Sequence, residues 1–261
     1  MSSRWAKADI SGKGPRTMAM THTADDTGEP IQKRSGWLVP LAVFVVTAAL
    51  SAIVLYYYLG PRPASFTRDV PSPTADTRLV HLTVSDVAFA IPANYIVYRS
   101  AQNGGDHSDV ALFALLPDFR GFSPADAQRF VSNAPDSRAI FLLVRGDKLN
   151  LSESERLKRI YLGYVTDPIG MTGPYGLTQY TFRNDSGYRD EDLFVGQTPR
   201  GPAVFRCVRF SADVPSPSCL RETPLTRGIA LSYRFKRTQL AEWREISTGA
   251  EALVRSFLVK N

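Results

Sequence analysis

An uncharged apolar stretch near the N-terminus is the feature that most constrains how this chain can fold. Residues 37–60 carry no charged side chain over 24 positions, and Lys33, Arg34 and Arg62 flank them. A helix of this length spans about 36 Å, which exceeds the ~30 Å hydrocarbon core of a bilayer. Tryptophan at one end and three tyrosines near the other suit the two interfacial belts of a membrane. The stretch therefore predicts one transmembrane helix, with the lipid bilayer as its partner.

A cleaved signal peptide is the alternative explanation for this stretch. The apolar core of a signal peptide is about 7 to 15 residues long and ends in a small-residue cleavage site. Here the apolar run is longer, follows a 36-residue polar tail, and ends in Leu-Tyr-Tyr-Tyr-Leu. Pro40 falls in the first helical turn, where its missing N–H costs nothing. We therefore predict an uncleaved signal-anchor, for which Met1, Met18 and Met20 are alternative start sites.

Charge gives a weak indication of orientation and excludes one class of partner. Lys33 and Arg34 adjoin the span on its N-terminal side, whereas Arg62 and Arg68 lie at similar range beyond it. The positive-inside rule then places the tail in the cytosol by a slight margin. The net charge of +6 comes from Lys and Arg interspersed with Asp and Glu along the whole chain. This pattern lacks the basic stripe of a nucleic-acid-binding protein, so we predict no nucleic-acid partner.

The two cysteines favour the same orientation. Cys207 and Cys219 both lie in the C-terminal part, separated by a segment rich in proline and serine that is typical of a turn between two strand ends. A disulfide between them would need an oxidising compartment. Two buried free thiols are the alternative. With the disulfide, the sequence predicts a bacterial inner-membrane protein whose C-terminal domain lies in the periplasm.

Composition divides the chain into four parts. Residues 1–36 are poor in large apolar side chains and are predicted to be a disordered cytosolic tail, followed by the transmembrane helix. Residues 61–77 contain four prolines among Ser, Thr and Ala, which predicts a semi-rigid, extended linker. Residues 78–261 are long enough for one extracytoplasmic domain of ordinary size.

Hydrophobic periodicity predicts the strands of this domain. Residues 79–84 alternate, so that Val80, Leu82 and Val84 share one face. Residues 110–116 and 139–144 are apolar on both faces and are predicted to be central strands covered on both sides. Period-two patterns and turn residues predict further strands at residues 87–91, 95–98, 176–182, 192–196, 203–210 and 229–236.

Caps and helical spacing predict the helices. Ser123 begins a helix that ends at about Val131, with a buried face made of Ala127, Phe130 and Val131. Ser152 or Ser154 caps a second helix, and a third helical region lies between Leu240 and Phe257, where Gly249 is expected to kink or interrupt it. Short connections between strands favour antiparallel neighbours. The predicted fold class is therefore α+β, with an antiparallel sheet and two or three helices.

Five basic residues form a candidate anion-binding face. If the strands at 203–210 and 229–236 pair, their basic side chains lie close together, namely Arg206, Arg209, Arg234, Lys236 and Arg237. Anionic lipid headgroups would be one ligand for such a surface. A solvated polar sheet face is the alternative explanation, because charged side chains on exposed strand faces are common.

Motifs for catalysis and metal binding are weak in this chain. Asp106, His107, Ser108 and Asp109 include the residue types of a nucleophilic triad, but neighbours in sequence rarely point at one another. The preceding Gly-Gly-Asp is explained by a glycine-rich turn. The acidic run from Asp190 to Asp192 lacks the ligand spacing of a calcium loop, and the cysteines and histidines lack zinc spacing. The sequence therefore indicates no catalytic residue, metal or cofactor.

Two functional hypotheses remain open. The first is a non-catalytic, membrane-anchored protein whose extracytoplasmic domain binds an envelope protein, a polymer or a small ligand. The alternative is an exported, membrane-tethered hydrolase with a dispersed active site. Clustering of His81 or His107 with Asp or Ser in a pocket would favour the enzyme. An exposed apolar patch would favour the binding module.

Overall fold

The structure is a computed structural model that describes residues 36–59 and 70–259. The chain separates into two units, residues 1–66 and residues 67–261. The predicted tail at 1–36 falls outside the described residues except for Gly36. The predicted linker at 61–77 is described only from Val70 onward, where Ser72 N donates to the Val97 carbonyl at 2.8 Å.

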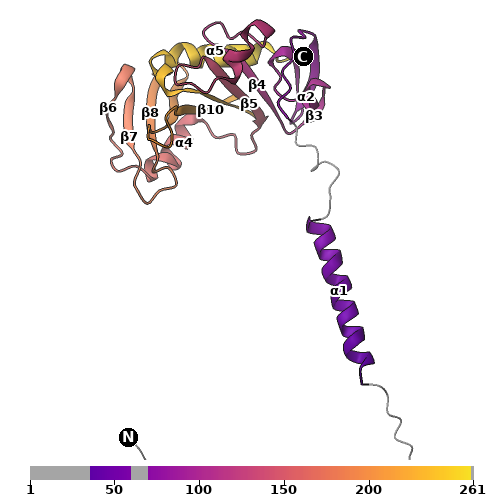
Figure 1. Cartoon of the computed structure of the whole chain (residues 1–261). Helices are drawn as coiled ribbons and strands as arrows, with labels where there is room; N and C mark the ends of the chain where they lie inside the picture. The colour runs from indigo at the N-terminus through magenta and orange to yellow at the C-terminus, as the bar shows by residue number, and fades with distance from the viewer. Residues whose placement is uncertain (1–35, 60–69, 260–261) are drawn as a thin grey trace, which may run out of the picture. The chain divides into compact units, whose positions relative to one another are not determined.

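The first unit contains one long apolar helix, α1 (Leu38–Leu59), shown in indigo in Figure 1. Its segment Leu38–Tyr57 has a mean hydropathy of 2.6 and buries none of its side chains inside the protein. By length and composition α1 can cross a membrane. Its bounds lie one residue inside the predicted span at each end.

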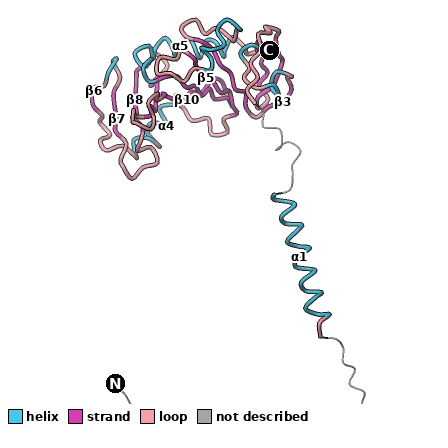
Figure 2. The backbone as a smooth tube through the Cα atoms, in the orientation of Figure 1, coloured by secondary structure: helices cyan, strands magenta, loops and turns pink. Residues whose placement is uncertain are grey.

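The second unit is α+β, as predicted, and is built on a large antiparallel sheet (Figures 1 and 2). The order of its eight strands is β4-β5-β11-β10-β9-β8-β7-β6. Their bounds are β4 (Asp109–Leu115), β5 (Ala139–Gly146), β6 (Met171–Thr172), β7 (Thr178–Thr181), β8 (Glu191–Thr198), β9 (Gly201–Val208), β10 (Ser218–Thr226) and β11 (Ile229–Lys236). A second sheet has the order β2-β1-β3 and consists of β1 (Leu79–Val84), β2 (Val87–Pro92) and β3 (Gly105–His107).

Helices cover the two faces of the large sheet unequally. Helix α5 (Trp243–Ser256), yellow in Figure 1, lies across one face, and the small sheet packs on the same side of the core. Helix α4 (Glu153–Arg159) packs on the other face over β8 and β9, through a cluster that includes Leu157 and Val204. Helix α3 (Ala127–Val131) covers the β4 and β5 end of that second face.

The helices differ from the sequence prediction in number and in detail. With the single turn α2 (Arg99–Gln102), the described part of this unit has four α-helices rather than two or three. No side chain caps α2, and it is too short to show helical spacing, so the sequence carries no signal for it. The prediction that Val131 is buried is also wrong. It is 72% exposed because α3 ends there, and only Phe130 reaches the core.

Helix α5 continues through Gly249 instead of being interrupted. The ring of Phe119 packs directly against this glycine, at a distance that a Cβ atom could not occupy. Glycine is therefore needed for close packing, and its helix-weakening effect is overcome by tertiary contacts. On either side of it, the apolar face of α5 enters the core through Trp243, Ile246, Ala250 and Val254.

The sheet corrects two strand predictions and contains one strand that was not predicted. Strand β4 forms an edge, and Phe141 on β5 is half exposed, so these two strands are not the doubly covered centre that was predicted. Residues 95–98 make only isolated bridges, such as Ile96 to Leu112. Strand β10 was not predicted because Pro224 interrupts its pattern, and the structure places that proline, exposed, at an irregularity in the register with β11.

Candidate binding site

The sheet divides where β9 meets β10, and the candidate site is built around this division. Strands β8 and β9 pair along their full length, from Glu191 opposite Val208 to Thr198 opposite Gly201. Strands β9 and β10 pair at only three positions, which end with Phe205 opposite Arg221. Past that pair the two strands separate, and backbone groups on both lose their neighbours. Such buried groups require other partners.

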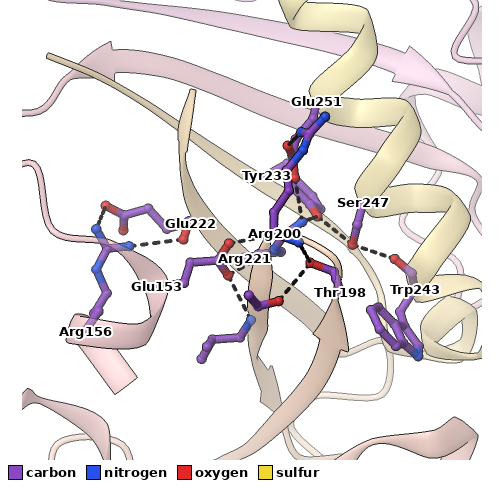
Figure 3. A network of polar contacts seen from close by, with 12 residues as sticks. Glu153, Arg156, Thr198, Arg200, Arg221, Glu222, Tyr233, Trp243, Ser247 and Glu251 are labelled. Carbon is purple, nitrogen blue, oxygen red and sulfur yellow. Dashed lines mark hydrogen bonds and ion pairs between the residues drawn. The ribbon is translucent and has the colours of Figure 1, made fainter. Parts of the chain in front are cut away.

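Side chains of α4 supply those partners. Ser152 and Glu155 form a capping box that begins α4 beside the division. From the first turn, Glu153 accepts a hydrogen bond from the Val204 N–H of β9, with N and Oε2 2.8 Å apart. From the next turn, Arg156 donates to the Glu222 carbonyl of β10 at 3.1 Å. Helix α4 therefore bridges the two separated strands, as Figure 3 shows.

Arg221 of β10 is the centre of a buried ion network (Figure 3). Its Nε and Nη2 atoms donate to the two carboxylate oxygens of Glu153 at 3.0 and 2.6 Å. Its Nη1 donates to the Tyr233 hydroxyl at 2.9 Å and to Glu251 of α5 at 3.1 Å. The side chains of Arg221 and Glu153 are only 5% and 7% exposed. One guanidinium thus joins β10, β11, α4 and α5.

Two members of the network, Arg221 and Tyr233, have raised pKa values. Burial opposes the charge of Arg221, but the electrostatic effect of Tyr233 and the hydrogen bond to Glu153 outweigh it and raise the pKa of the guanidinium. Burial raises the pKa of Tyr233 to about 12, although Arg221 and Ser247 act in the opposite direction. The Tyr233 hydroxyl lies 3.1 Å from Ser247 Oγ, which donates in turn to the Trp243 carbonyl.

A cleft opens above this network, between α5 and the turn that joins β8 to β9. One hollow has a volume of about 530 Å³ and a second one about 460 Å³. Both are lined by Thr198, Arg200, Arg221, Glu251 and Arg255. Arg200 reaches from the β8–β9 turn to Glu251 of α5, with Nη1 and Oε2 2.7 Å apart. This ion pair therefore lies at the boundary of the two hollows.

The polar face of α5 forms one wall of the cleft. Arg244, Thr248, Glu251 and Arg255 recur at helical spacing, opposite the apolar face that enters the core. Arg244 lies over the ring of Trp243, with its guanidinium carbon 4.2 Å from the ring centroid. Together the two hollows are lined by four arginines and two glutamates, so the cleft has an excess of positive charge.

The structure does not place all five basic residues of the predicted anion-binding face side by side. Strand β10 lies between β9 and β11, so Leu220 stands between Arg206 and Arg234. Arg234 is exposed in a hollow of about 510 Å³ on the sheet face opposite α5, which also exposes Phe141. Lys236 lines the same hollow but is buried and donates to the Asn133 side chain.

The other three basic residues are held by nearby acids. Arg206 pairs with Glu191 at 3.1 Å. Arg209 and Arg237 both bind Asp192, at 2.8 and 2.6 Å. Two acids of the run that resembled a calcium loop are thus engaged in ion pairs. Among residues 36–59 and 70–259, no group of three or more His, Cys, Asp or Glu side chains could hold a metal ion.

The two cysteines lie in directly opposed positions on β9 and β10. Cys207 and Cys219 form the first of the three residue pairs between these strands, and their Sγ atoms are at bonding distance, 1.97 Å. The cysteine pair therefore lies where β9 and β10 are still paired. Helix α4 fills the gap farther along, where the two strands separate. Both cysteine side chains are fully buried.

His107 and its neighbours do not assemble a triad. His107 is held by the Gly104 carbonyl at 3.2 Å, whereas Ser108 Oγ donates to Asp109 and Thr83 to Asp106. These groups lie on the small sheet and at the start of β4. The four residues from Asp106 to Asp109 thus lie near one another without a hydrogen bond from His107 to a serine or an acid.

We expect His107→Gln to leave partner binding and stability nearly unchanged. Glutamine can donate to the Gly104 carbonyl as histidine does, so the free energy of unfolding should change by less than about 0.5 kcal/mol. Denaturant titration of the full chain, together with binding assays on the same material, measures both quantities. Loss of function in a normally folded variant would instead assign chemistry to the segment around His107.

Comparison with known proteins gives a fold and no family. No protein-family model matches the sequence, and no curated protein matches it. Among solved structures, Smlt3025, described as an immunity protein of the Stenotrophomonas maltophilia type IV secretion system, has a similar fold with a TM-score of 0.52. The two sequences are 14% identical, and the match covers 74% of this chain and 98% of Smlt3025. At this identity the likeness concerns the fold alone.

Sequence reasoning missed the residues that line the cleft. Arg244, Thr248, Glu251 and Arg255 could have been found as the polar face of a helix whose apolar face was predicted. Arg221 carried no such signal, because its strand was not recognised and its partner Glu153 lies 68 residues away in sequence.

Proposed function

We propose that this chain is a single-pass membrane protein whose C-terminal unit is a non-catalytic binding module for a protein outside the cytosol. The observation that carries the proposal is the arginine-lined cleft above a buried network whose groups bind one another. Such a site offers fixed charge and shape, which are the requirements for recognition. Oxidative folding of the cysteine pair fits the periplasm of a bacterium, with α1 in the inner membrane.

The network argues against the hydrolase alternative. A general base near neutral pH needs a pKa close to the working pH. The pKa of Tyr233 is instead raised to about 12, so its hydroxyl stays protonated and cannot act as a base. Ser247 donates its proton to a backbone carbonyl, and Glu153 is occupied by Arg221 and Val204. The groups nearest the cleft are therefore arranged for structure and binding.

The structural neighbour supports a protein partner. Smlt3025 is described as an immunity protein of a secretion system, and the two chains share a fold. A module of this fold that is tethered to the membrane would meet its partner in the cell envelope. The polymer and small-ligand alternatives lack comparable support.

Topology is the first test of this proposal. A reporter that is active only after export, fused after Asn261, should be active, and a cytosol-only reporter at the same position should be silent. The charge-free α1 segment and the buried cysteine pair motivate this expectation. Fusions placed before Trp37 should give the opposite pattern. Activity of the cytosolic reporter after Asn261 would contradict the proposed orientation.

Partner capture is the second test. A photo-crosslinking side chain at Thr248 in the cleft should give a discrete protein adduct in native membranes, whereas the same group at exposed Val131 on α3 should not. The comparison separates binding in the cleft from contact by chance. Absence of an adduct from Thr248, or turnover of an envelope polymer that depends on Ser247, would contradict the binding module.

A further inference from the structure

A carboxylate already lies among the arginines of the cleft. Glu251 Oε2 is 2.7 Å from Arg200 Nη1 and 3.9 Å from Arg255 Nη2, while Oε1 is 3.1 Å from Arg221 Nη1. The Glu251 side chain is only 12% exposed. Three guanidinium groups thus converge on one carboxylate. Guanidinium groups are suited to binding planar oxyanions such as carboxylates.

Two of these arginines are free to turn toward a ligand, and one is fixed. The side chains of Arg200 and Arg255 are 74% and 39% exposed. Because these two guanidinium groups reach solvent, water screens their ion pairs with Glu251, so exchanging one carboxylate for another costs little. Arg221 is held below them by Glu153 through two hydrogen bonds. The cleft therefore combines a rigid floor with adjustable walls.

Charge in the cleft is not balanced internally. Glu153 pairs with Arg221, and Glu251 pairs with Arg221 and Arg200, which leaves Arg244 and Arg255 without an acid within hydrogen-bond distance in the cleft. Two further negative charges would complete the balance. The two hollows continue on both sides of the Arg200–Glu251 pair, so the site is extended rather than a single point.

We propose that the cleft binds an acidic segment of the protein partner, whose carboxylates take the place of Glu251 on Arg200 and Arg255. This assignment rests on the binding function proposed above and adds the chemistry of the partner. Glu251 then acts as an internal competitor that occupies the arginines until the partner arrives. Arg244, stacked on Trp243, binds a second carboxylate farther along α5.

A protein segment fits this cleft better than a membrane surface. The arginines line the walls of hollows of about 530 and 460 Å³, whereas a bilayer presents its headgroups in a plane. The internal occupant is itself the side chain of a glutamate. An extended chain that carries several Asp or Glu residues can follow the cleft past Glu251 and reach arginines on both sides of it.

The test measures binding of an oligo-glutamate peptide to the full chain in nanodiscs of phosphatidylcholine. Arg200→Gln/Arg255→Gln should weaken binding about tenfold, since two charge-assisted contacts are lost. The control Arg227→Gln/Arg234→Gln removes the same charge from exposed positions outside the cleft and should change binding less than about twofold. Oligo-glutamine should not bind. Equal losses in both double variants would overturn the proposal.

Glu251→Gln distinguishes an internal competitor from a structural residue. Arg221 keeps both hydrogen bonds to Glu153, so the fold should survive, as the unfolding midpoint will show. Removing the competitor should tighten oligo-glutamate binding by about threefold to tenfold. A purely structural role predicts weaker binding or none. Weaker binding by a stably folded Glu251→Gln protein would therefore overturn the proposal.

Two further experiments distinguish an acidic protein segment from a membrane surface and from a partner that binds elsewhere. Vesicles that contain phosphatidylglycerol test the membrane as ligand, and loss of vesicle binding without loss of peptide binding in Arg200→Gln/Arg255→Gln would overturn the protein assignment. Crosslinking from Thr248 tests the cleft in native membranes. If this double variant captures the partner at the wild-type yield, the acidic-segment proposal fails while the binding module stands.

Discussion

Replacing Arg221 by methionine is expected to lower the free energy of unfolding by about 3–5 kcal/mol. Methionine keeps much of the aliphatic volume but removes the guanidinium that pairs with Glu153, whose side chain is 7% exposed. An uncompensated buried charge would result, and the Tyr233 hydroxyl would keep only its hydrogen bond to Ser247. Because domains are stable by about 5–15 kcal/mol in total, this single change approaches the limit of folding.

Denaturant titration of the full chain in nanodiscs, followed through the fully buried Trp243, measures the change. Arg234→Met on neighbouring β11 is the matched control, because that arginine is exposed on the opposite face of the sheet. It should alter the free energy of unfolding by less than about 0.5 kcal/mol. A similar loss in both variants would contradict the role given to the network.

A double variant separates the ion pair from packing. In Arg221→Met/Glu153→Gln both charges are gone, and glutamine still accepts from the Val204 N–H through its carbonyl oxygen. The double variant should therefore be more stable than Arg221→Met alone, with a coupling of about 1–3 kcal/mol between the two sites. Additive losses would show that the two side chains act independently.

The parts of the fold that the sequence predicted are those with local periodicity. Strand β1 and strand β11 alternate regularly, and α1 is long and apolar, so each element is determined by its own residues. The α+β class with antiparallel connections followed from these patterns. The α+β class is confirmed. The placements of α1 in a bilayer and of the C-terminal unit in the periplasm stay predictions.

The parts that failed depend on contacts distant in sequence. The short helix α2 has no cap or period, and Gly249 stays helical because Phe119 packs on it. Arg221 lies in a segment for which the sequence predicted no strand, and the burial of its charge depends on Glu153 from α4 and Glu251 from α5. The pairing of the strand at 203–210 with the strand at 229–236, which the candidate anion-binding face assumed, does not form because β10 lies between them.

Removing the disulfide is the other change for which a large effect is expected. Cys207→Ala/Cys219→Ala should lower the free energy of unfolding by about 2–4 kcal/mol, because a loop with a sequence separation of 12 is no longer closed in the unfolded chain. Alanine avoids placing a hydroxyl in a fully buried position. Mass spectrometry of alkylated, unreduced wild type should show the two cysteine peptides linked, and quantitative labelling of both thiols would exclude the bond.

The location of the cysteines predicts which part of the sheet loses stability in the Cys207→Ala/Cys219→Ala variant. Only three residue pairs join β9 to β10, and the cysteines form the first of them, so the disulfide and α4 hold the same junction from opposite ends. Hydrogen exchange at residues 203–208 and 218–223 should therefore accelerate far more than at the β4–β5 pairing, which is continuous over seven positions. Uniform acceleration across the sheet would mean that the bond acts only through the unfolded chain. Local acceleration at the junction would show that it keeps β9 and β10 together in the native fold, and with them the floor of the cleft.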